Sequence, residues 1–353
     1  MEITIPIEKR MINALLLHSS FIDNLGLLNG KMGIAIFFFH LAKETENSIY
    51  SDYADELVAD IYNEISLSTP VDFENGLAGI GWGLCYLIEK GFIETDSDKM
   101  FSDIDKNLFE AYCSSHSENI REITGYGFYL LKRVRNATDQ KSLDAIVNKQ
   151  HLTDIIEKLD NILRIDELRK EPEMFDLLWD YPLLIVFLSE MLQLNLMPVR
   201  VQEIITRILK PVSVDEKLPE RHSNRLLLTL ALTKTASVDT KSLGLLCKPA
   251  IRLLSTGIDR DVISKELKTN CAFMQHGTIG ISFLYKQLFL LTGEVHYETE
   301  AKWWMEQSFR FPENDQGYAG FFIGMGEEPL AFGLLNGLAG LSLFALYQDY
   351  KFV

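Results

Sequence analysis

The sequence predicts an all-α protein, an α/α toroid in which seven inner helices alternate with seven outer helices. Three observations lead to this prediction. Short glycine turns recur, each followed by an apolar stretch of helical length; amphipathic stretches lie between them; and alternating β-branched runs of the kind that form strands are nearly missing. We expect residues 1–353 to form a single domain of seven helical-hairpin repeats.

The glycine turns share the pattern Asn-Gly-x-x-Gly and run directly into an apolar stretch. Three copies are complete, in "LNGKMG", "ENGLAG" and "LNGLAG", and a fourth, "QHGTIG", has His276 in place of the asparagine. Glycine has no Cβ, so the chain can turn sharply into the following helix. The structural glycines predicted from this pattern are Gly30, Gly33, Gly76, Gly79, Gly127, Gly277, Gly280, Gly337 and Gly340.

Three weaker copies complete the series of seven. The segment "REITGYG" keeps Gly127 but has Thr124 at the position of the first glycine. Two further turns place Asp180 and Asn224 at that position, each before a leucine-rich stretch. The copies follow one another at nearly even steps, as expected of a repeat protein.

The stretches between the glycine turns are amphipathic. Ser51–Ile65 and Leu152–Asp166 carry apolar residues at helical spacing, whereas the stretches after the glycines are apolar nearly all round. Buried helices in an inner ring and amphipathic helices in an outer ring satisfy both patterns. The turns would then gather at one mouth of the toroid, where a site would draw residues from several repeats.

The composition limits the classes of partner. The chain has 353 residues, of which 47% are hydrophobic, and a formal charge of -16, which disfavours binding to nucleic acid or to an anionic membrane. Its four cysteines are Cys85, Cys113, Cys247 and Cys271, and no two form a C-x-x-C pair, as is typical of a reducing compartment. We find no signal-peptide pattern and no apolar run long enough to span a bilayer, so we expect a cytoplasmic protein.

Taken together, the glycine-turn segments resemble a known family. "LGLLNGKMGIAIFFFHLAKETEN", "TPVDFENGLAGIGWGLCYLIEKGFI", "HGTIGISFLYKQLFLLTGE" and "GYAGFFIGMGEEPLAFGLLNGLAGLSLFAL" are similar to the lanthionine synthetase C-like family, the lanthipeptide cyclases. The resemblance extends over about residues 20–350. It implies a toroid with a zinc ion at its mouth, bound by two cysteines and a histidine. In the family, the metal makes a substrate cysteine a thiolate, which adds to dehydroalanine or dehydrobutyrine and closes a thioether ring.

Only one of the three zinc ligands that the resemblance implies is matched here. The sixth-repeat turn has His276, but Gln275 stands where a cysteine is expected. The fifth-repeat region, Glu220–Ala231, contains no cysteine, and the fourth-repeat region lacks a histidine that the family is thought to use in acid–base work. We therefore expect no zinc cofactor; if a metal were bound, its ligands would be His276, Cys271 and His222.

The leading functional hypothesis is a cyclase-like protein that serves the maturation of a ribosomally made peptide without zinc–thiolate catalysis. Its partners would be the precursor peptide and a dehydratase or another modifying enzyme. The alternative is an active cyclase, either with rearranged zinc ligands or metal-free with His276 as the catalytic general base toward a substrate cysteine. Whether the protein is an enzyme thus stays open. The candidate substrate-binding residues are Gln275, His222, Asp180 and Asn336.

A further alternative is an unrelated enzyme on the same barrel, such as a glycoside hydrolase. This reaction needs two acids across the mouth. Asp72 and Glu74 precede one glycine turn, and Glu327 and Glu328 precede another. Acids just ahead of a helix also cap its N-terminus and interact favourably with the helix dipole, so their position does not require catalysis.

Overall fold

The structure is a computed structural model. It describes residues 7–66, 68–94, 97–115, 117–213, 218–239, 241–267, 271–308 and 332–346. These residues form helices and turns and include no strand, and the predicted all-α class is confirmed. The chain divides into two compact units: unit 1 is Met1–Ala145 with Glu327–Val353, and unit 2 is Ile146–Gly326. The single domain over residues 1–353 stays a prediction.

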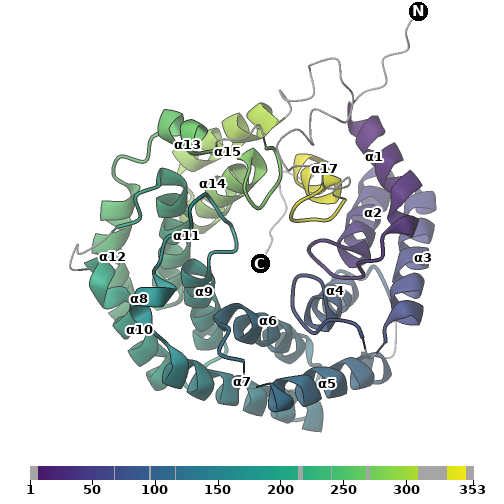
Figure 1. Cartoon of the computed structure of the whole chain (residues 1–353), viewed down its shortest axis with the longest axis horizontal. Coiled ribbons are helices and arrows are strands. Elements are labelled where there is room, and N and C mark those ends of the chain that lie inside the picture. Colours follow the sequence, from purple (N-terminus) through teal and green to yellow (C-terminus); the bar gives the residue numbers. More distant parts are fainter. Residues whose placement is uncertain are drawn as a thin grey trace, which may run out of the picture. The chain divides into compact units, whose positions relative to one another are not determined.

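Unit 1 contains the first helices of the chain and the last helix that the structure describes (Figure 1). Its elements are α1 (Ile7–His18), a short 3-10 helix η1 (Ser19–Phe21), α2 (Lys31–Thr45), α3 (Ser48–Glu64), α4 (Leu77–Glu89), α5 (Ser97–Ser114), α6 (Ile120–Asn136) and α17 (Leu338–Leu346).

Unit 2 contains the middle of the chain, and α7 begins just before its boundary. Its elements are α7 (Leu143–Ile162), α8 (Ile165–Leu168), α9 (Asp180–Gln193), α10 (Pro198–Ser213), α11 (His222–Val238), α12 (Ser242–Ser255), α13 (Arg260–Glu266), α14 (Thr278–Thr292) and α15 (Val295–Ser308). Among the described helices of both units, none is long and apolar enough to cross a membrane.

Each unit has two layers of helices. In unit 1, the buried helices α17, α2, α4 and α6 pack side by side in that order, and α3 and α5 cover α2 and α4. In unit 2, α9, α11 and α14 pack side by side, and α10, α12 and α15 cover them (Figure 1). The predicted alternation of buried and amphipathic helices is therefore present within each unit.

The first glycine is the N-cap of the following helix in three of the turns. Gly30, Gly76 and Gly277 are extended, with φ of -133°, -124° and -122°. The next backbone N–H donates to a carbonyl at the start of the turn, as in the bond of 2.9 Å from Lys31 N to Asn24 O and of 2.8 Å from Leu77 N to Pro70 O. The turn thus folds back on itself and satisfies N–H groups that a helix N-terminus leaves without intrahelical partners.

The second glycine of each turn lies inside the helix, at its third residue, and its role is steric. A Cβ added there would overlap the carbonyl oxygen of the residue six positions earlier. The glycines and the residues that carry these oxygens are Gly33 with Leu27, Gly79 with Phe73, Gly280 with Met274, and Gly340 with Leu334. These glycines are needed because the turn packs directly onto the helix that it precedes.

The three weaker copies differ from the predicted turn. Thr124 and Gly127 lie inside α6 and not in a turn, because α6 already begins at Ile120 and the Asn119 side chain caps it through a 3.0 Å bond from Arg121 N. Asp180 is the first residue of α9, and Asn224 is the third residue of α11. Side chains, in place of glycine turns, cap α6 and α11.

Candidate functional site

The turn that carries His276 contacts residues 175–178, a segment of unit 2 that is about 100 residues earlier in the sequence. His276 Nδ1 is 2.7 Å from Phe175 O. A carbonyl oxygen only accepts, so Nδ1 carries the proton, and the lone pair of the neutral ring is on Nε2. The histidine is half-buried. Its orientation is therefore fixed by the backbone, and Nε2 is the nitrogen that is able to accept a proton.

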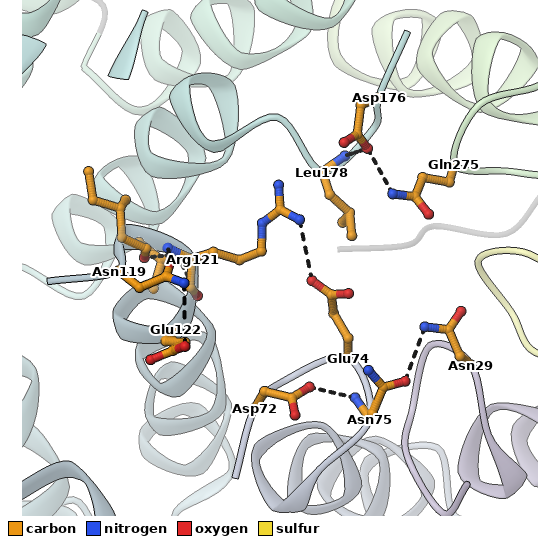
Figure 2. A network of polar contacts seen from close by, with 12 residues as sticks. Asn29, Asp72, Glu74, Asn75, Asn119, Arg121, Glu122, Asp176, Leu178 and Gln275 are labelled. Atoms are coloured by element: carbon orange, nitrogen blue, oxygen red, sulfur yellow. Dashed lines mark hydrogen bonds and ion pairs between the residues drawn. The ribbon is translucent and has the colours of Figure 1, made fainter. Parts of the chain in front are cut away.

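Gln275 fastens the same two segments together (Figure 2). Its side-chain Nε2 donates to Asp176 Oδ1 at 3.0 Å, and its main-chain carbonyl oxygen accepts from Leu177 N at 3.0 Å. Asp176 Oδ1 also accepts from Leu178 N at 2.9 Å. The amide at the position where the resemblance expects a cysteine ligand thus holds the turn in place.

The N-terminus of α11, at the fifth repeat, is capped by two carboxylates from distant segments, Glu171 and Glu266. A carboxylate at this end of a helix also interacts favourably with the helix dipole. Glu171 accepts from Glu220 N, Arg221 N and Asn224 Nδ2, and Glu266 accepts from His222 N, Ser223 N and Ser223 Oγ, all at 2.7–3.0 Å. These bonds explain why this helix begins without a glycine.

The two ring nitrogens of His222 are arranged in the opposite way to those of His276. His222 Nδ1 accepts from Asp259 N at 3.0 Å. The lone pair of Nδ1 is thus occupied, and Nε2 carries the proton in the neutral ring. In this arrangement neither nitrogen offers a lone pair to a metal.

Cys271 has a structural place at the start of the His276 turn. Its side chain is buried, its carbonyl oxygen accepts from Thr278 N at 3.1 Å, and burial raises the pKa of its thiol. A raised pKa disfavours the thiolate that a metal requires. Over the parts of the chain that the structure describes, no three or more His, Cys, Asp or Glu side chains are grouped to hold a metal, so Cys271, His222 and His276 do not fit a three-ligand zinc site.

The remaining candidate residues lie in separate places. Asp180 is half-buried in the first turn of α9, where an acid is favourable for the helix. Asn336 is half-buried in the turn before α17 and belongs to unit 1, whereas Asp180, His222, Gln275 and His276 belong to unit 2. Within unit 2, only Gln275 and His276 are brought to the same contact, with residues 175–178.

The turns of unit 1 form a second polar cluster (Figure 2). Asp72 Oδ1 accepts from Asn75 N at 2.7 Å, and Glu74 Oε1 lies 3.6 Å from a guanidinium nitrogen of Arg121. Asp72 thus bonds within its own turn and Glu74 faces Arg121 of α6, and neither contact requires a glycosidase role. Glu327 and Glu328 lie outside the described residues.

Several polar residues of these clusters were not among the sequence candidates. Asp176, Glu171 and Glu266 have no motif around them, and their partners are far away in the sequence. Asn29 and Asn75 had a signal, because each precedes the first glycine of a complete turn. This repeated position indicates a turn but does not by itself predict that the two asparagines contact one another.

Two comparisons with known proteins give a match. A family model described as "Lanthionine synthetase C-like protein" matches residues 21–177. A solved structure of nisin cyclase is similar, with a TM-score of 0.46 and 12% identity, over 98% of this chain and 95% of that chain. No curated protein sequence gives a match. The matched residues run from the first glycine turn to the segment that contacts His276. Residues 21–177 of this chain are therefore similar in sequence to the lanthionine synthetase C-like family.

Proposed function

We propose that this protein serves the maturation of a ribosomally made, lanthipeptide-type peptide, and that it binds the precursor peptide or a partner enzyme without zinc–thiolate catalysis. The match of residues 21–177 to the lanthionine synthetase C-like family model supports the role in peptide modification. The observation that carries the second part is the contact of Gln275 with Asp176, because an amide tied into the scaffold occupies the position of a ligand.

The side chains around this turn support the same proposal. Zinc with three protein ligands needs three donors that converge on one point. His276 has one suitable lone pair, on Nε2, while the Nδ1 of His222 accepts from Asp259 N and the Cys271 thiol is buried. The polar atoms near the turn thus stabilise the fold, which supports a binding role without zinc.

A metal-free cyclase is the second candidate, and the orientation of His276 favours it. Because Nδ1 donates to Phe175 O, the neutral ring has its lone pair on Nε2, where it can act as a base. It would take the proton of a substrate cysteine thiol, and the thiolate sulfur would form a bond to the β-carbon of a dehydroalanine. The α-carbon would then recover the proton from the imidazolium, so that the histidine ends as it began.

A dehydrated, cysteine-containing precursor peptide separates the two candidates. We expect it to bind the full-length protein in the micromolar range, while titration of free thiols shows no loss above that of the peptide alone. His276→Ala is the test variant, and His296→Ala, at an exposed position on α15, is the matched control. Thiol loss that His276→Ala abolishes and His296→Ala leaves unchanged would contradict the binding role and establish the metal-free cyclase.

A further inference from the structure

The glycine turns of unit 1 are stacked on one another in a repeated way. Gly26 of the first turn packs against the backbone of Asn75 in the second, and Gly333 of the last turn packs against the backbone of Asn29 in the first. In both cases a Cβ on the glycine would overlap the asparagine backbone. The asparagines that precede α17, α2 and α4 are therefore held at equivalent places in successive turns.

Backbone hydrogen bonds join the same turns. Leu335 N donates to Leu28 O at 2.8 Å, and Leu28 N donates to Glu74 O at 2.9 Å. Each of these residues comes directly before the asparagine of its turn. We call the three asparagines, Asn336, Asn29 and Asn75, the carboxamide row. Its spacing is set by the backbone and not by the side chains.

Two members of the row, Asn29 and Asn75, each have a side-chain hydrogen-bonding group that is not engaged within the described residues. Asn75 Oδ1 accepts from Asn24 Nδ2 at 2.8 Å and from Asn29 Nδ2 at 3.2 Å, which uses both of its lone pairs (Figure 2). Within the described residues, no hydrogen bond engages Asn75 Nδ2 or Asn29 Oδ1. Both side chains are half-buried, and so one donor and one acceptor are available at two adjoining turns.

We propose that the carboxamide row binds the main chain of an extended segment of the precursor peptide. Asn75 Nδ2 donates to a peptide carbonyl, and Asn29 Oδ1 accepts from a peptide N–H. Each peptide unit offers one donor and one acceptor, which complements this pair. This proposal rests on the peptide-binding role proposed above and names the residues that perform it.

The chemistry of the row suits main chain better than charged side chains. The carboxamides are uncharged, and the Asn24–Asn75–Asn29 bonds fix them before any ligand arrives, which lowers the entropy cost of binding. Main-chain hydrogen bonds also supply affinity that depends little on sequence. We therefore expect the row to tolerate different side chains along the bound peptide.

The test uses the full-length protein, Asn75→Asp and Asn63→Asp. Asn75→Asp keeps an oxygen that accepts from Asn24 and Asn29 but removes the donor that the peptide carbonyl needs. Asn63→Asp makes the same change of charge at an exposed position on α3 of the same unit. The probe is a short fluorescein-labelled peptide of Ser, Thr, Cys, Leu and Phe, together with a copy N-methylated at alternate residues, and binding is measured by fluorescence anisotropy.

We expect the probe to bind about tenfold more weakly to Asn75→Asp than to the wild type, and the N-methylated copy to bind the wild type about tenfold more weakly than the probe does. Asn63→Asp should bind like the wild type. The N-methylated copy needs no variant, so the test holds even if Asn75→Asp does not fold. Equal binding of both peptides to the wild type, or undiminished binding to a folded Asn75→Asp, would overturn the carboxamide row and leave the proposed function standing. No binding to the wild type would contradict both.

Discussion

Replacing Gly79 with alanine is expected to destabilise the protein by about 3 kcal/mol. Gly79 is buried at the third residue of α4, where a Cβ would overlap the carbonyl oxygen of Phe73 and approach the Leu27 Cβ to 2.9 Å. The first obstacle is backbone of the preceding turn, and the second belongs to the neighbouring turn. Neither is the flexible end of a side chain, so the two turns of unit 1 have to move apart.

Urea unfolding followed by circular dichroism measures this loss. The matched control is Gly91→Ala, at the opposite end of the same helix. Gly91 has nothing within 4 Å of an added Cβ, but its φ is +68°, so only the left-handed conformation is penalised, at about 1 kcal/mol. If the two variants lost equal free energy of unfolding, the contact between turn and helix would not be the reason why position 79 requires glycine.

We expect acid to lower the free energy of unfolding through protonation of His40. This residue lies in α2 with 5% of its surface exposed, and its Nε2 is 2.9 Å from Tyr86 Oη. Burial, together with the charges of Lys43 and Lys90, lowers the pKa of His40 from 6.5 to about 4. The folded state thus favours the neutral ring. The resulting stability is fully present above pH 6.5 and is lost as the pH falls toward 4.

His40→Gln separates this contribution from that of the carboxylates, because the glutamine does not titrate. Between about pH 7 and about pH 4.5, the free energy of unfolding of the wild type should fall by about 2 kcal/mol more than that of the variant. Urea unfolding at a series of pH values measures both. Parallel pH dependence in the two proteins would mean that His40 is able to accept a proton without cost in the folded state.

The turns show how far the fold follows from the sequence. Gly30, Gly76, Gly277 and Gly337 each come directly before a helix. At Gly30, Gly76 and Gly277, a Cβ would overlap the backbone of the turn that folds back on the helix. The same pattern misplaced Thr124, since α6 starts earlier with a side-chain cap from Asn119. A local sequence pattern therefore predicts where a helix begins when the glycine turn itself caps that helix. It fails where a side chain such as that of Asn119 caps the helix at an earlier residue.

The candidate site follows from the sequence only in part. His276 and Gln275 stand in a repeated motif, so their position at a turn was predictable. Their contacts with Phe175 and Asp176 were not, because these pairs join segments that meet only in the folded unit. The same holds for Glu171, which caps α11 from a segment 50 residues earlier in the sequence than Arg221. Such contacts depend on tertiary packing, and no spacing within the sequence encodes them.

The family match and the polar contacts fit the binding role proposed above. Residues 21–177 match the family model, while the turn at Gln275 and His276 is held by contacts that leave one imidazole lone pair. Half-buried amides, Asn29 and Asn75, lie at turns of unit 1. These groups suit the binding of a peptide main chain and require no metal.

The most direct measurement of the central claim is the zinc content of the purified full-length protein, after incubation with excess zinc and desalting, by inductively coupled plasma mass spectrometry. We predict far less than one zinc per chain, with no difference between the wild type and His276→Ala, because the donors beside His276 do not converge. About one zinc per chain in the wild type, lost in His276→Ala, would contradict the claim that this turn has become structural.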